Sequence, residues 1–116
     1  MATAIIIQAR MESKRLPGKP LLQVAGKPLI QYVCELAKQV ESANYVIVTT
    51  PDKEIAHAVK TFGGVWFPSS FAAENGTQRC AEVVERLRKE ANITHVVNWQ
   101  CDEVLLLLLL LLNICN

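Results

Sequence analysis

Continuous apolar runs alternate along the chain with segments in which apolar residues recur at helical spacing. The runs are TAIIIQ (3–8), YVIVTT (45–50), THVVNW (94–99) and a shorter one, VWF (65–67). Such β-branched runs are typical of strands covered on both faces of a parallel sheet. The helical spacing lies between them, at 29–40, 55–62 and 80–91. This order, β-α-β-α-β-α-β, predicts a mostly parallel, three-layer α/β sheet with right-handed crossovers.

Local signals indicate where the helices begin and where a ligand would bind. Pro28 and Pro51 suit first helical positions, with Thr50 as an N-cap before the second helix. Ligands of such sheets bind outside the carboxyl ends of the strands. The segments of interest therefore begin after Gln8 and after Trp99.

Composition narrows the class of protein. With 116 residues, 51% of them hydrophobic, the chain suits one globular domain, and a net charge of +1 excludes a globally basic nucleic-acid coat or an acidic disordered tail. The four cysteines lack zinc-site spacing, which favours reduced thiols in the cytoplasm. We expect neither a signal peptide nor a membrane span.

The first segment of interest, QARMESKRLPGKPL (8–21), is rich in cations: Arg10, Lys14, Arg15 and Lys19 face a single acid, Glu12. Arginine binds phosphates through two parallel hydrogen bonds, and lysine supplies a compact charge. The segment is neither a GxGxxG motif nor a Walker loop. Two interpretations remain open from the residues alone: a polyphosphate site and a solvated basic loop.

The second segment, NWQCDEV (98–104), is predicted as a loop that places Asp102 and Glu103 just beyond a buried strand. Mg²⁺ prefers one or two carboxylates together with substrate phosphate oxygens, so Asp102 opposite a cationic loop suits a metal site. An exposed acidic turn is the alternative. A third segment, AENGTQRCAEV (73–83), sets Asn75, Gly76 and Thr77 at a helix start, which suits either an anion or simple capping.

The last part of the chain contains eight consecutive leucines, Leu105–Leu112. The tract is shorter than a membrane span and too uniform to specify core packing. We interpret 1–103 as the functional part and 104–116 as a low-complexity tail foreign to it, with a buried core segment as the alternative.

Taken together, ARMESKRLPGKPL, AGKPLI, FGG, NGTQRCAEVVERL and VVNWQCDE resemble, in order and spacing, the cytidylyltransferases that activate acidic sugars. VVNWQCDE favours the branch that acts on 3-deoxy-manno-octulosonate (KDO). The resemblance covers residues 4–103 and implies an incomplete Rossmann-like nucleotidyltransferase fold of α/β/α layers. It also implies CTP and KDO as substrates, Mg²⁺ as cofactor and a role in lipopolysaccharide synthesis. Full-length relatives are expected to form homodimers. We expect neither nucleic acid nor a membrane as a partner.

The resemblance also implies roles for individual residues. Arg10 and Lys19 would bind the triphosphate as catalytic groups, and Asp102 would bind Mg²⁺. Nucleotide contacts would come from Ser13, Arg15, Gly18, Asn75, Gly76, Thr77 and Arg79, with Gln100 near the sugar or nucleotide.

The chain departs from the family pattern at three positions and in length. Gln78 replaces an acid, Cys101 a glycine and Val104 a proline. Family members continue into a second half that supplies sugar-binding residues, the dimer contact and a further metal carboxylate, so we expect weak CTP binding and little turnover. The alternatives are a cytidylyltransferase for another acidic or spore-coat sugar and a non-catalytic nucleotide-binding remnant.

Overall fold

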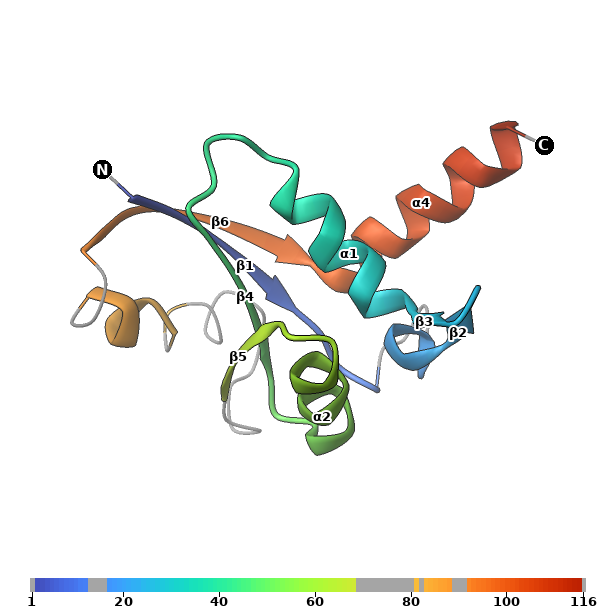
Figure 1. Cartoon of the computed structure of the whole chain (residues 1–116), viewed down its shortest axis with the longest axis horizontal. Coiled ribbons are helices and arrows are strands. Elements are labelled where there is room, and N and C mark those ends of the chain that lie inside the picture. The colour runs from blue at the N-terminus through green and yellow to red at the C-terminus, as the bar shows by residue number, and fades with distance from the viewer. Residues whose placement is uncertain (1, 13–16, 69–80, 82, 89–91, 116) are drawn as a thin grey trace.

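The computed structural model describes residues 2–12, 17–68, 81, 83–88 and 92–115, with side chains at 109 and 111–115 left out. Figure 1 shows the arrangement of the elements. These elements, in chain order, are β1 (Ala2–Gln8), the 3-10 helix η1 (Lys19–Leu21), β2 (Gln23–Val24), β3 (Lys27–Pro28), α1 (Leu29–Lys38), β4 (Tyr45–Thr50), α2 (Lys53–Thr61), β5 (Val65–Pro68), β6 (Ile93–Gln100) and α4 (Cys101–Cys115). Residues 81 and 83–88 are also helical.

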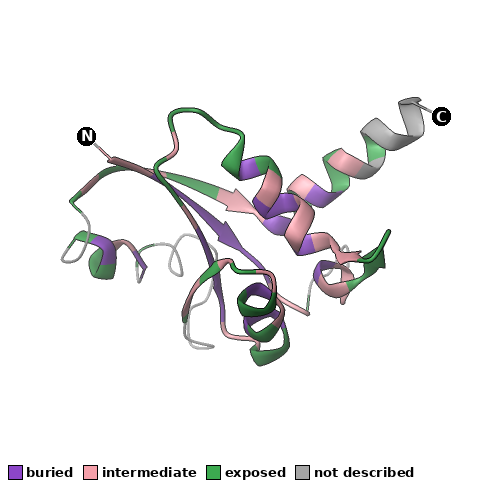
Figure 2. Cartoon of the chain, viewed as in Figure 1, coloured by how far each residue is buried: buried purple, intermediate pink, exposed green. Residues whose placement is uncertain are grey.

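Four parallel strands form the main sheet in the order β5-β4-β1-β6, which confirms the predicted parallel sheet. Strand β1 lies between β4 and β6, so its backbone is paired on both sides. Its residues from Ala4 to Gln8 are buried, as the uninterrupted apolar run predicts (Figure 2). The sheet therefore places the end of β1 at the centre of its carboxyl edge.

Helices cover both faces of this sheet, which confirms the three-layer prediction. On one face, Ile5, Ile7 and Val48 pack with buried residues of α1, α2 and α4. On the other, Ala4, Ile6 and Ile47 pack with Val83 and Leu87 of the helical residues 83–88. Alternate residues of each strand thus enter different cores, because successive side chains of a strand point to opposite faces.

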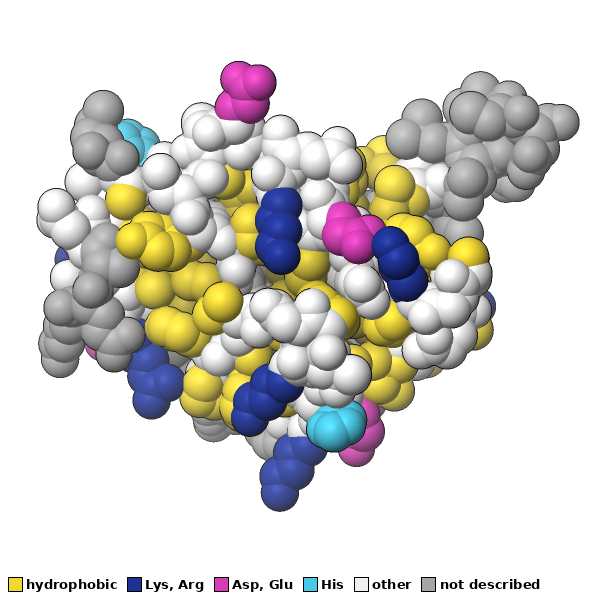
Figure 3. Space-filling model, in the orientation of Figure 1, with side chains coloured by type: hydrophobic (Ala, Val, Ile, Leu, Met, Phe, Trp, Pro, Cys, Tyr) yellow, Lys and Arg dark blue, Asp and Glu magenta, His cyan; other side chains and the backbone are white. Residues whose placement is uncertain are grey.

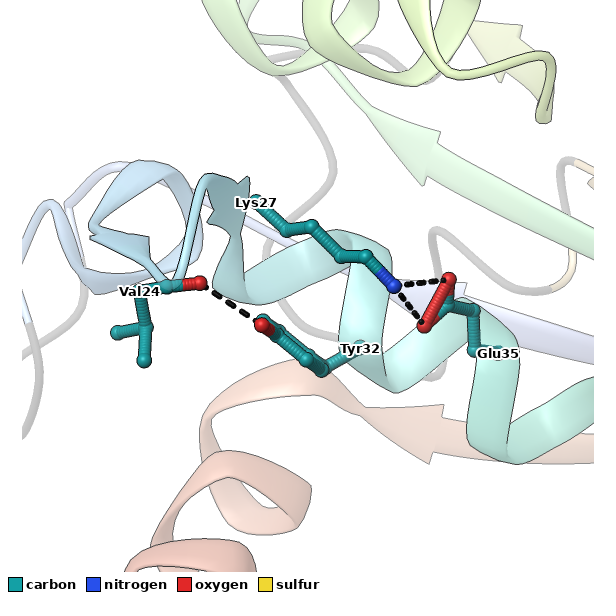
Figure 4. Close-up of polar contacts among 4 residues, drawn as sticks. All are labelled: Val24, Lys27, Tyr32 and Glu35. Carbon is teal, nitrogen blue, oxygen red and sulfur yellow. Dashed lines mark hydrogen bonds and ion pairs between the residues drawn. The ribbon is translucent and has the colours of Figure 1, made fainter.

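A small hairpin of β2 and β3, which the sequence analysis missed, joins η1 to α1. Its turn contains Ala25 (φ 52°) and Gly26 (φ 82°), a left-handed pair typical of tight hairpins. Lys27 Nζ lies 3.1 Å from both carboxylate oxygens of Glu35, and the Tyr32 hydroxyl donates to the Val24 carbonyl at 2.8 Å (Figure 4). The charge of Lys27 is therefore paired within the hairpin and α1.

Both predicted helix starts were wrong by a small margin. Pro28 lies in β3 as the residue before α1, and α2 begins at Lys53 with Asp52 in the N-cap position. Thr50 remains the last residue of β4, where its hydroxyl accepts a hydrogen bond from the Asp52 N–H at 3.1 Å. Each helix begins one or two residues later than predicted because the preceding residues keep extended backbone.

The segment after β6 is a helix, which corrects the prediction of a loop there. Helix α4 starts at Cys101, directly after Gln100, and includes the leucine tract. Cys101 and Leu105 are buried against α1, whereas Leu107 and Leu110 are exposed as the helix extends from the body (Figure 1). The first turns of α4 thus belong to the core, and a boundary at 104 falls inside one helix.

None of the helices in the described part of the chain reaches the length and apolar character that crossing a membrane requires.

Candidate functional site

The two chemically rich segments of the sequence leave the sheet at the same edge. Gln8, the last residue of β1, is in register with Gln100, the last residue of β6. Arg10 and Asp102 each follow two residues later. The structure therefore confirms that the cationic segment and the Asp102 segment share one edge.

Backbone hydrogen bonds fix the start of the cationic segment around Arg10. The Ala9 N–H donates to the Thr49 carbonyl at 3.2 Å, and the Met11 N–H donates to Asp52 Oδ2 at 3.1 Å. Arg10 itself is half-buried, and its Nε is buried without a hydrogen-bond partner among the described residues. A buried donor without a partner costs about 1–3 kcal/mol, so this atom is suited to an anionic ligand.

Gly18 and Lys19 close the same segment from its other side. The Gly18 N–H donates to the Met11 carbonyl at 2.9 Å, and Gly18 adopts φ 71°, a left-handed conformation that glycine tolerates best. Lys19 is then the first residue of η1 and is half-buried. On the face shown in Figure 3, described Lys and Arg side chains are spaced apart and form no broad basic patch.

Asp102 lies in the first turn of α4, where the helix dipole favours negative charge. Its Oδ1 accepts a hydrogen bond from the Glu103 N–H at 3.0 Å. Among the described residues, no group of three or more His, Cys, Asp or Glu is placed to hold a metal ion. Mg²⁺ is usually held by one or two carboxylates together with waters and oxygens of a bound substrate.

Cys101, which stands where the family pattern has glycine, directs its thiol into the core. It is 1% exposed and belongs to the same cluster as Cys34, and Val104 packs against that cluster. Burial raises the pKa of each thiol to about 12, and for Cys101 the neighbouring Cys34 adds to the effect. The side chain at this position therefore packs in the core, and both thiols stay protonated near neutral pH.

The remaining predicted site residues lie outside the described residues. They are Ser13, Arg15, Asn75, Gly76, Thr77 and Arg79, together with the departure at Gln78. Their proposed roles stay predictions.

The sequence analysis missed polar residues on β1, β4 and β6 that lie at the same edge. Gln8 is 3% exposed and Thr49 is fully buried, and Gln8 Nε2 donates to Asn98 Oδ1 at 2.5 Å. The sequence contained a signal for these residues, because the amide of Gln8 and the hydroxyl of Thr49 interrupt otherwise apolar runs just where the strands end.

A parallel α/β sheet with cationic and acidic groups beyond its carboxyl edge is the arrangement of a nucleotide-binding α/β protein. The sequence matches a family model described as cytidylyltransferase over residues 4–115. The chain therefore belongs to the cytidylyltransferase family.

Curated relatives include two 3-deoxy-manno-octulosonate cytidylyltransferases. That of Haemophilus influenzae (strain PittGG) is 47% identical over 106 residues, which is 91% of this chain and 41% of the relative. That of Vibrio cholerae serotype O1 (strain M66-2) is 45% identical over the same shares. The chain thus spans about two fifths of the length of the curated relatives it matches.

Solved structures that share the fold include two with the following similarity. A CMP:2-keto-3-deoxy-manno-octonic acid synthetase complexed with CTP aligns with a TM-score of 0.76 and 42% identity, over 87% of this chain and 40% of that one. A cytidylyltransferase from Leptospira borgpetersenii serovar Hardjo-bovis (strain JB197) aligns with a TM-score of 0.68 and 27% identity, over 88% and 42%.

Proposed function

We propose that this chain is the CTP-binding part of a cytidylyltransferase that forms CMP-KDO and pyrophosphate from CTP and KDO. The observation that carries the proposal is Arg10, whose buried Nε has no partner among the described residues and lies at the edge that Asp102 shares. The relatives' names and the CTP complex of the similar structure support it. The pathway it would serve is lipopolysaccharide synthesis in the cytoplasm.

The chemistry assigned to the site is the attack of a sugar hydroxyl on the α-phosphorus, with pyrophosphate as the leaving group. Negative charge then accumulates on the phosphate oxygens. Fixed cations stabilise such charge best where they need no rearrangement. Arg10 and Lys19 would bind the triphosphate, held by the Met11 and Gly18 hydrogen bonds described above, and Gln100 would lie near the sugar or nucleotide.

Asp102 is the residue proposed to bind Mg²⁺ together with substrate phosphates. The ion, when bound, would neutralise charge on those phosphates. Homodimers are proposed only for the full-length relatives.

Replacing Arg10 by alanine is expected to weaken CTP binding by about 10- to 100-fold, because hydrogen bonds to charged groups contribute about 1.5–3 kcal/mol. The measurement is isothermal titration calorimetry of CTP into the 116-residue chain in the presence of Mg²⁺. Lys38→Ala is the control for net charge, because exposed Lys38 lies beside Asn44 and Tyr45 at the opposite end of the sheet. Unchanged binding by Arg10→Ala, or an equal loss in both variants, would contradict the assignment.

Gly18→Ala is expected to weaken CTP binding in addition to costing about 1–2 kcal/mol of stability, because alanine is strained at φ 71°. Gly26→Ala carries the same strain, at φ 82°, in the hairpin away from the site. Neither glycine has a neighbouring atom within 4 Å of an added Cβ, so strain is the shared effect. Calorimetry should show weaker binding for Gly18→Ala alone, and an equal loss in both variants would remove Gly18 from the site.

Pyrophosphate release with CTP and a panel of acidic sugars tests the choice of sugar. The protein tested is a full-length relative into which the residues of this chain have been introduced. KDO is its expected acceptor. Preference for another acidic or spore-coat sugar would support the alternative member of the family, and failure of the chain to bind CTP would support a remnant without nucleotide-binding function.

A further inference from the structure

Asp52 occupies the N-cap position of α2, yet its carboxylate faces another segment of the chain. A side-chain oxygen at an N-cap usually accepts a hydrogen bond from a backbone N–H of the first helical turn. The Asp52 carboxylate makes no such bond with the described residues of α2. Its Oδ2 instead accepts from the Met11 N–H at 3.1 Å, across 41 residues of sequence. The carboxylate therefore holds the cationic segment and not its own helix.

Met11 joins the two ends of that segment. Its N–H is bound by Asp52, and its carbonyl accepts from the Gly18 N–H at 2.9 Å. Arg10 directly precedes Met11, and Lys19 directly follows Gly18. The Met11 side chain also packs against the core cluster to which α2 contributes. A shift of Met11 would therefore move both cations.

Asp52 is itself held by partners in the sheet. Its N–H donates to Thr50 Oγ1 at 3.1 Å, and Thr50 is fully buried. The Thr50 carbonyl accepts from Trp66 Nε1 of β5, also at 3.1 Å. Hydrogen bonds with an ionised acceptor are stronger than neutral ones, and half-buried Asp52 offers such an acceptor to Met11. The sheet thus fixes Asp52, and Asp52 in turn fixes the start of the cationic segment.

We propose that Asp52 is a positioning residue, whose carboxylate holds Met11 and thereby places Arg10 and Lys19 for the triphosphate. Cations stabilise phosphate charge best when they are already in position before the ligand arrives. The negative charge of Asp52 repels phosphates, so what it contributes is an oxygen at one fixed place. This role rests on the proposed function, since both cations are assigned there to the triphosphate.

Two substitutions separate the contact with Met11 from the other properties of Asp52. Asparagine keeps an oxygen at the same place in the side chain without the charge, whereas the serine oxygen lies one bond nearer to the backbone. Both residues are good N-caps, so α2 should still begin at Lys53. Calorimetry with Mg²⁺ should show CTP binding about tenfold weaker in Asp52→Ser, the lower end for a hydrogen bond to a charged group. Asp52→Asn should stay within about threefold of the parent chain, because a neutral hydrogen bond is about half as strong.

Glu54→Gln is the matched control, because exposed Glu54 is an acid in the first turn of the same helix. It removes the same charge and should keep the CTP affinity of the parent. A second comparison uses a chain that already carries Arg10→Ala. There Asp52→Ser should weaken binding by much less than tenfold, because two residues that act through one contact are not additive. Full additivity would mean that Asp52 does not act through Arg10, which overturns the proposal.

Thermal unfolding without nucleotide separates positioning from stability. The Tm values of Asp52→Ser and Asp52→Asn should agree within a few degrees, because serine can cap α2 in exchange for the lost contact. Equal losses of CTP affinity in these two variants, or a similar loss in Glu54→Gln, would overturn the role of Asp52 and leave the triphosphate site intact. A parent chain that does not bind CTP would overturn the proposed function as well.

Discussion

Leu105→Ala is expected to lower the free energy of unfolding by about 2–5 kcal/mol. Leu105 is 1% exposed and packs with Ile30, Cys34 and Cys101 between α4 and α1. Truncating it removes apolar contacts and leaves a cavity that the neighbouring helix can fill only in part. Urea denaturation followed by circular dichroism measures the change.

Leu107→Ala is the matched control, because it makes the same change in the same helix at a residue that is 60% exposed. Its effect should stay within about 0.5 kcal/mol. Equal effects of the two substitutions would mean that α4 does not pack as described, and would favour interpreting the leucine tract as a tail outside the fold.

The chain is expected to lose stability steeply in alkaline solution because Cys34 and Cys101 are buried as neutral thiols. Folding raises their pKa values from 9.0 to about 12, mainly through desolvation. Below about pH 9 both thiols are protonated in the folded and unfolded chains, so their contribution is complete. Between pH 9 and about pH 12 only the unfolded chain releases these protons, and each thiol then costs about 1.4 kcal/mol per pH unit.

Urea midpoints measured from pH 8 to pH 11 should show this decline. The chain that carries both Cys34→Ala and Cys101→Ala has a lower starting stability but no thiols to ionise at these positions, so its decline should be much shallower. If that variant declines as steeply as the parent, other groups cause the alkaline loss.

Much of the fold was predictable because the strands carry one strong signal. Four apolar runs became β1, β4, β5 and β6, but only the interior strands β1 and β4 have the buried residues that such runs predict. The prediction that 94–99 is a buried strand was wrong, because β6 is an edge strand whose residues are exposed or half-buried. The β2–β3 hairpin was missed because its strands are short and exposed in part, so they lack such a run. Only the turn at Ala25 and Gly26 could have indicated it.

Helix α4 was not predictable from pattern because eight identical leucines carry no periodicity. The burial of Leu105 and the exposure of Leu107 are set by where Cys101 leaves β6 and meets α1, which is tertiary information. The same contact explains why the thiol of Cys101, which stands where the family pattern has glycine, packs in the core.

The sequence predicted that the candidate site lies at the carboxyl edge of the sheet, because parallel strands end at the same edge. That rule and the charges indicated the two segments, and the family resemblance selected Arg10, Lys19 and Asp102 within them. Gln8 and Thr49 did not stand out, because a polar residue inside an apolar run becomes notable only when its hydrogen-bond partners can be counted.

The position of β1 in the middle of the sheet has a consequence for the order of folding. Its pairing with β6 joins Ala2 to Ile93, so nearly the whole chain must be synthesised before the central strand gains its second neighbour. Contacts between residues so far apart in sequence form slowly. Until β6 arrives, one edge of β1, with its run of isoleucines, stays open to pairing with other chains. A nascent chain of this protein is therefore expected to depend on chaperones until residue 100 has left the ribosome.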